Sequence, residues 1–115
     1  MTTWVRATTA HAIPERASIR IAPGDEVTVR RRDTTWPAFV FVETDDGEGW
    51  VPERFLATDA GRTTVLTSYD TTELATEVGE RLAVVATDHQ GGWVWCRNAD
   101  GAEGWVPMST VEPDR

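Results

Sequence analysis

Hydrophobic and polar positions alternate in short runs along most of the chain. Val27 and Val29 alternate with polar residues, and Val94 and Cys96 alternate with Trp93 and Trp95. A period of two places successive side chains on opposite faces, which is typical of half-buried β-strands. No stretch shows a 3.6-residue apolar period long enough for a helix. The pattern therefore predicts an all-β protein.

Turn residues separate these runs at regular intervals. Residues 44–47 (TDDG) and residues 98–101 (NADG) each end in Asp-Gly between apolar runs, which favours a tight hairpin. Pro52 and Pro107 each close the strand that follows such a turn, where a missing backbone N–H costs little. The chain is thus expected to form two hairpins of similar construction.

The two hairpins belong to an internal repeat. Residues 24–29 (GDEVTV) match residues 79–84 (GERLAV), and residues 49–52 (GWVP) match residues 104–107 (GWVP) at the same spacing. A shared spacing between separate anchors is the mark of a duplicated structural unit. The repeat predicts two domains, residues 1–58 and residues 59–115, joined by a short polar link near residues 58–62.

Composition and charge narrow the range of partners. The 115 residues include 19 acidic and 11 basic residues, the latter all Arg, and the net charge is −8. An acidic surface repels nucleic-acid phosphates and anionic lipid headgroups, so neither nucleic acid nor a membrane is expected as a partner. The sequence has one cysteine and no apolar run long enough to cross a bilayer. We expect a cytoplasmic protein.

The order of the motifs resembles that of Src homology 3 (SH3) domains. The second repeat contains, in order, residues 65–69 (VLTSY), Glu73-Leu74, Gly79-Glu80, residues 92–96 (GWVWC) and residues 104–107 (GWVP). The chain also resembles bacterial tandem SH3-type proteins. This resemblance implies two tandem SH3-like small β-barrels of about five strands each, acting as a binding module.

The same resemblance implies two ligand-binding grooves lined with aromatic side chains. SH3 domains bind proline-rich segments because a polyproline II helix is preformed and fits between aromatic rings. Residue by residue, the second repeat offers Tyr69, Trp93 and Pro107 as groove walls and Glu73 as an acidic contact. The first repeat offers His11, Trp36 or Phe39, Pro52 and Phe55. The expected partner is a protein or peptide that is proline-rich and basic.

Other assignments follow from the same residues. Val42 and Cys96 are expected in the core, Trp50 and Trp105 are expected to pair across strands with Phe41 and Trp95, and Arg30–Arg32 are expected on a solvated face. No motif for a nucleophile, a metal site or a phosphate-binding loop is present, so we expect neither an enzyme nor a cofactor. Two alternatives remain: an assembly protein whose aromatic surfaces pack its two barrels together, and a binder of small ligands between the barrels.

Overall fold

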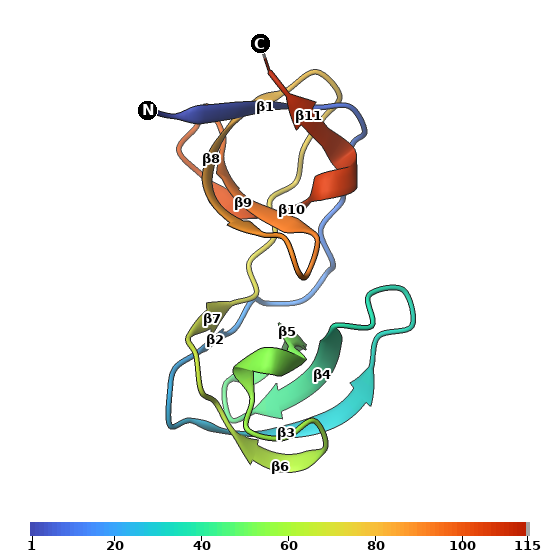
Figure 1. Ribbon diagram of the computed structural model, residues 1–115, viewed down its shortest axis with the longest axis vertical. Helices are drawn as coiled ribbons and strands as arrows, with labels where there is room; N and C mark the ends of the chain where they lie inside the picture. The colour runs from blue at the N-terminus through green and yellow to red at the C-terminus, as the bar shows by residue number, and fades with distance from the viewer. Residues whose placement is uncertain (115) are drawn as a thin grey trace. The chain divides into compact units, whose positions relative to one another are not determined.

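The computed structural model describes residues 1–114, and its regular structure is built from β-strands (Figure 1). The helical segments among these residues are two single-turn 3₁₀ helices, η1 (Glu53–Phe55) and η2 (Met108–Thr110). No helix in the described part of the chain is long and apolar enough to cross a membrane. The prediction of an all-β protein is therefore confirmed.

The described residues form two compact units that divide the chain in an interleaved way. The central unit consists of residues 16–71. The terminal unit consists of residues 1–15 and the segment from residue 72 onward. These units do not coincide with the expected ranges 1–58 and 59–115.

The terminal unit contains one sheet of five antiparallel strands in the order β10-β9-β8-β1-β11. Figure 1 shows the blue N-terminal strand β1 among the orange and red strands of the C-terminal part of the chain. The unit's core combines Val5 from β1 with Leu74, Leu82, Val94, Cys96 and Val106. Its strands are β1 (Thr3–Ala7), β8 (Arg81–Asp88), β9 (Trp93–Arg97), β10 (Glu103–Pro107) and β11 (Val111–Pro113).

The central unit contains a four-stranded sheet in the order β5-β4-β3-β6 and a short two-stranded ribbon, β2-β7. The apolar residues of the alternating runs point inward, and Val27, Val42 and Val51 are fully buried. Its strands are β2 (Arg20–Ile21), β3 (Glu26–Arg32), β4 (Phe39–Thr44), β5 (Gly47–Pro52), β6 (Gly61–Thr64) and β7 (Tyr69–Asp70).

Both units contain the same meander of three strands followed by a 3₁₀ turn, which is β3-β4-β5-η1 in one and β8-β9-β10-η2 in the other. Each meander is completed by a strand that packs beside its first member. In the terminal unit this strand is β1, which pairs with β8. In the central unit it is β6, which pairs with β3.

These two completing strands are exchanged between the repeats. β1 comes before the first meander in the sequence but completes the second one, whereas β6 comes after the first meander and completes it. The second partner of each strand is equivalent too. Ala7 of β1 lies opposite Val111, and Val65 just after β6 forms a bridge with Leu56.

A tight turn explains why the chain does not divide near residue 58 as expected. Gly61 has φ of +68°, a left-handed conformation that glycine adopts without steric cost, and it lies where residues 58–61 reverse the chain. The Ala57 N–H then donates to the Thr64 carbonyl oxygen at 2.9 Å. Residues 58–61 therefore form a hairpin turn inside the central unit, and the chain passes between units near residues 15 and 71.

Within residues 1–114, the expected closed barrels of five strands are not found. The sheet of the terminal unit ends at β10 and β11, and that of the central unit ends at β5 and β6. The outer edge of β10 is instead met by an irregular segment, since Glu73 forms a parallel bridge with Trp105. One bridge of this kind protects the edge strand without adding a sixth strand to the ladder.

Candidate functional site

Four of the predicted site residues come together in the terminal unit, and we call His11, Glu73, Trp93 and Pro107 the terminal cluster. The His11 and Trp93 rings are edge to face, with centroids 5.8 Å apart. His11 Nε2 lies 2.9 Å from Glu73 Oε1. Trp93 opens β9 directly opposite Pro107, the last residue of β10. The cluster therefore joins two aromatic rings, a proline and a carboxylate.

The backbone holds the terminal cluster in place from both sides. His11 and Thr76 exchange two backbone hydrogen bonds of 3.1 Å, which fixes the segment after β1 against the segment before β8. Residues 72–74 are held along β10, because the Leu74 N–H donates to the Trp105 oxygen at 3.0 Å and the Trp105 N–H donates to the Thr72 oxygen at 2.9 Å.

Gly104 makes this approach to β10 possible. A Cβ added at Gly104 would lie 2.6 Å from the backbone carbon of Glu73 and 2.7 Å from the backbone nitrogen of Leu74. Such distances are shorter than van der Waals contact, so any larger residue would push the segment away. The glycine of the Gly-Trp-Val-Pro motif thus sets the position of Glu73.

A second group, the central cluster, contains Phe39, Pro52, Phe55 and Tyr69 in the central unit. The Phe55 and Tyr69 rings are edge to face, with centroids 5.6 Å apart. Phe39 opens β4 directly opposite Pro52, the last residue of β5. Phe39 is 5 % exposed, so Phe55 and Tyr69 supply more of the accessible aromatic surface.

Trp36 lies in the loop before β4, where the Phe39 N–H donates to its backbone oxygen at 2.9 Å. It is half-buried and belongs to the same unit as the central cluster. The sequence left open whether Trp36 or Phe39 is the equivalent of Trp93. The strand register shows that Phe39 holds the position equivalent to Trp93, because Phe39 lies opposite Pro52 as Trp93 lies opposite Pro107.

The structure groups the predicted residues differently from the sequence. Tyr69 was grouped with Trp93 and Pro107, but it lies with Phe55 in the central unit. His11 was grouped with Phe39 and Pro52, but it lies with Trp93 in the terminal unit. The exchange of β1 and β6 causes both changes, because each residue follows its strand into the other unit.

Two arginines beside the central cluster were not predicted from the sequence. Arg20 of β2 donates to Asp70 of β7 at 3.0 Å, so an ion pair lies next to Tyr69 across the ribbon. Arg54 stacks on Phe55 at 4.6 Å from the ring centroid. The internal repeat could not have indicated either contact, since no Arg occupies the matching positions of the second repeat.

The three consecutive arginines at the end of β3 are exposed, as predicted, but each contacts a neighbour. Arg30 pairs with Glu43 at 3.0 Å, and Arg32 pairs with Glu53. Arg31 stacks on Phe41 at 4.3 Å from the ring centroid. The Glu43 pairing lowers the pKa of that carboxyl, mainly through the hydrogen bond from Arg30. These arginines stabilise the outer face of the sheet.

The predicted cross-strand aromatic pairs are confirmed. Phe41 packs edge to face on Trp50 with centroids 4.9 Å apart, and Trp95 packs on Trp105 with centroids 5.2 Å apart. The Trp95 Nε1–H also donates to Glu103 at 2.7 Å, which lowers the pKa of that carboxyl. Pairs of this type contribute roughly 0.2–1 kcal/mol each to a sheet.

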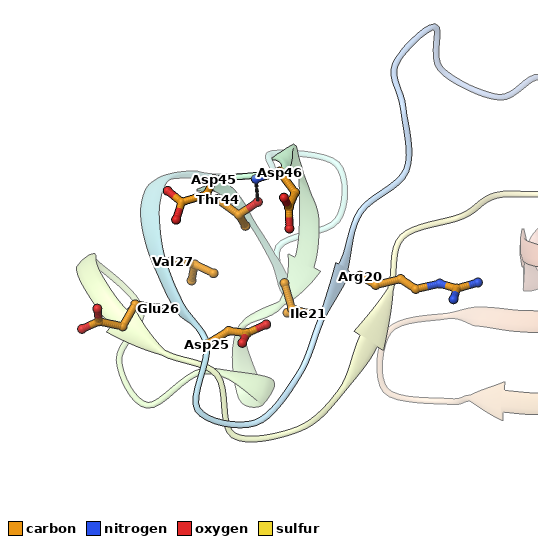
Figure 2. Close-up of a pocket in the computed structure, with 8 residues that line it drawn as sticks. All are labelled: Arg20, Ile21, Asp25, Glu26, Val27, Thr44, Asp45 and Asp46. Carbon is orange, nitrogen blue, oxygen red and sulfur yellow. Dashed lines mark hydrogen bonds between the residues drawn. The ribbon is translucent and has the colours of Figure 1, made fainter.

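A separate depression opens at one end of the central unit (Figure 2). Ile21 and Val27 line it together with acidic residues of two turns, and the carboxylates of Glu26 and Asp45 point away from it. Two of its polar groups already have partners: Asp25 accepts from the Ala22 N–H at 2.9 Å, and Thr44 Oγ1 accepts from the Asp46 N–H at 3.0 Å. Across residues 1–114, no three His, Cys, Asp or Glu side chains are arranged to hold a metal ion.

Cys96 is a core residue, as predicted from its place in the alternation. Its side chain is fully buried, and burial raises the pKa of its thiol to about 11. Because the thiolate is the nucleophilic form, this cysteine is unreactive at neutral pH. Val42 occupies the comparable place in the central unit and is also fully buried.

Comparison with known families gives one finding. The family model described as "Variant SH3 domain" matches residues 65–114, which supports an SH3-like domain in this part of the chain. Such domains commonly mediate protein interactions and are generally not catalytic. A comparison with curated proteins found no match. The matched stretch begins with residues 65–71, which the structure places in the central unit, whereas β1 supplies the completing strand of the terminal unit.

Proposed function

We propose that the chain is a non-enzymatic protein-binding module with two SH3-like units, whose terminal and central clusters each bind a proline-containing, basic segment of a partner protein. The observation that carries this proposal is that aromatic side chains and a proline gather at equivalent places in both units. Trp93 lies opposite Pro107 across β9 and β10, and Phe39 lies opposite Pro52 across β4 and β5. Phe39 and both prolines are buried, so the accessible aromatic surface comes from Trp93 in one unit and from Phe55 and Tyr69 in the other.

The chemistry of the clusters favours such a ligand. An extended proline-containing segment loses little conformational entropy on binding and packs its rings against aromatic faces. The half-buried Glu73 supplies a carboxylate beside His11, which suits an Arg of the ligand. The net charge of −8 attracts a basic segment over longer range. Affinity is expected near micromolar, or about −8 kcal/mol, as for other short extended ligands.

The proposal is tested by titrating the full chain with Arg-flanked, proline-rich peptides and following tryptophan fluorescence. Trp93→Ala should weaken binding at the terminal cluster about tenfold or more, because it removes the largest aromatic contact. Phe55→Ala should do the same at the central cluster. Val85→Ser, at an exposed position of β8, is the matched control and should leave affinity unchanged.

Circular dichroism of each variant separates loss of binding from loss of fold. If the folded Trp93→Ala and Phe55→Ala variants both bind as tightly as the wild-type chain, the clusters are not the binding sites. If the wild-type chain binds none of the peptides at millimolar concentration, the proline-rich ligand class is wrong.

A further inference from the structure

The two clusters carry different aromatic side chains at one equivalent position. His11 is the fourth residue after Ala7, and Tyr69 is the fourth residue after Val65, while Ala7 and Val65 hold equivalent places in the strand ladders. The backbone of His11 is bridged to Thr76, and that of Tyr69 is paired with Ile21. The same site therefore carries an imidazole in the terminal unit and a phenol in the central unit.

This difference matters because the two rings respond differently to pH. Imidazole is the side chain whose unperturbed charge change falls between pH 5 and 8, whereas a phenol stays neutral throughout that range. Only the terminal cluster can therefore change its charge near neutral pH through this ring.

The surroundings of His11 couple its charge to the acidic contact of the cluster. The Glu73 carboxylate, on the segment before β8, is the charged group that faces the imidazole, with Oε1 at 2.9 Å from Nε2. β9 contributes the neutral indole of Trp93, and Thr76 contributes a backbone pair. The side chains of His11 and Glu73 are 15 % and 24 % exposed, so water screens the pair only in part.

We propose that His11 makes ligand binding by the terminal cluster pH-dependent, so that a basic peptide binds when His11 is neutral and is released when His11 is protonated. This inference rests on the proposed function. The Nε2–H of the neutral imidazole already donates to Glu73 Oε1, and a second proton, on Nδ1, makes this hydrogen bond charge-assisted, so that it holds the carboxylate more strongly against a ligand Arg. The second proton also places a positive charge where the ligand's own positive charge must lie. Both effects weaken binding in acid.

The test follows the Trp93 indole resonance of the full chain by NMR during titration with an Arg-flanked, proline-rich peptide at pH 7.5 and pH 5.5. This resonance reports on the terminal cluster even if the central cluster binds as well. The wild-type chain should bind several-fold more weakly at pH 5.5, because the added proton places a positive charge beside Glu73. The same peptide with Gln in place of Arg should lose most of this pH dependence.

Two variants assign the effect to the correct histidine. His11→Tyr recreates the ring found at position 69 and should bind with nearly the same affinity at both pH values. His89→Gln changes the exposed histidine between β8 and β9 and should keep the wild-type pH dependence. The His11→Tyr comparison also controls for pH effects that do not involve His11.

The outcomes separate this inference from the function on which it rests. Equal affinity at both pH values in the wild-type chain would overturn the role of His11 and leave the peptide-binding function intact. A pH dependence that persists in His11→Tyr would also overturn it. No shift of the Trp93 resonance at either pH would remove both peptide binding by this cluster and its control by His11.

Discussion

Gly49 and Gly104 open the two Gly-Trp-Val-Pro segments, but their surroundings differ. A Cβ on Gly104 would collide with the backbone of Glu73 and Leu74 at 2.6 and 2.7 Å. A Cβ on Gly49 would meet only the side chains of Thr71 and Ile19, with its shortest distance 3.3 Å. Side chains can rotate away from such a contact more easily than a hydrogen-bonded backbone can. The same motif residue is thus more tightly constrained in the terminal unit.

We expect Gly104→Ala to destabilise the terminal unit by about 1–3 kcal/mol, as overpacking in a closely packed site does. Gly49→Ala should cost clearly less, and the two midpoints of urea unfolding compare them directly. Gly104→Ala should also weaken peptide binding at the terminal cluster, because Glu73 must move. Equal loss of stability in the two variants would contradict the interpretation that backbone contacts constrain Gly104 more tightly than side-chain contacts constrain Gly49.

The Asp114 carboxylate forms ion pairs with two arginines. It accepts from Arg6 at 2.8 Å and from Arg81 at 2.6 Å, and these hydrogen bonds hold its pKa below the ordinary value. A carboxyl with a lowered folded-state pKa contributes stability above its unfolded pKa, near 4, and this contribution is lost as pH falls through the folded pKa.

Asp114→Asn is therefore expected to be less stable than the wild-type chain at pH 7, with the difference shrinking below about pH 4. Thermal unfolding at pH 7, 5 and 3 measures this difference. Glu48→Gln, at an exposed position of β5, is the control and should show little change at pH 7. A stability difference that stays constant down to pH 3 would show that Asp114 acts through packing rather than charge.

Among the elements, the meanders could be predicted from sequence and the exchange of β1 and β6 could not. The alternation around Val27 and Val94, the Asp-Gly turns and the repeated Gly-Trp-Val-Pro segments predicted the strands, the core residues and the aromatic pairs. The completing strands carry no such information, because residues 5–7 (VRA) and residues 63–65 (TTV) are both short, with two of their three side chains buried. Either could complete either meander, and the turn at residues 58–61 favours the local pairing of β6.

The site residues on the meanders were likewise predictable from sequence, whereas the grouping of those after the completing strands was not. Phe39 and Pro52 lie opposite each other in one meander, and Trp93 and Pro107 do so in the other, so each pair stays within the repeat to which it was assigned. His11 and Tyr69 belong to the segments that follow the completing strands, so the sequence-based grouping placed each of them beside residues of the other unit. Only the pairing of β1 with β8 reveals which unit each ring joins.

The exchange can be tested with Val5→Ala in β1. Val5 lies in the terminal core opposite Leu82, so losing its methyl groups should cost about 2 kcal/mol and reduce hydrogen-exchange protection in β8 and β11. Thr63→Ala is the matched variant, because Thr63 lies opposite Val27 at the equivalent place. It should reduce protection in β3 instead. If Val5→Ala exposes β3 while β8 stays protected, the strands are not exchanged.

For the whole molecule, the interleaved units mean that each cluster is assembled from both halves of the sequence. Residues 1–15 carry a ring of the terminal cluster, and residues 61–71 carry a ring of the central cluster. Cutting the chain at the boundary of the repeats, near residue 58, would leave each fragment with the completing strand of the other unit. Each compact unit is therefore built from parts of both sequence repeats.

The exchange of β1 also sets an order of events on the ribosome. The central unit lies within residues 16–71 and can close as soon as these residues have emerged, whereas β1 is made first but must wait for β8 and β11. At translation rates of roughly 5–20 residues per second, that delay is on the order of ten seconds. During this time an apolar strand has no partner in its own nascent chain. β1 is only five residues long and contains the charged Arg6, and both features limit its pairing with strands of other chains.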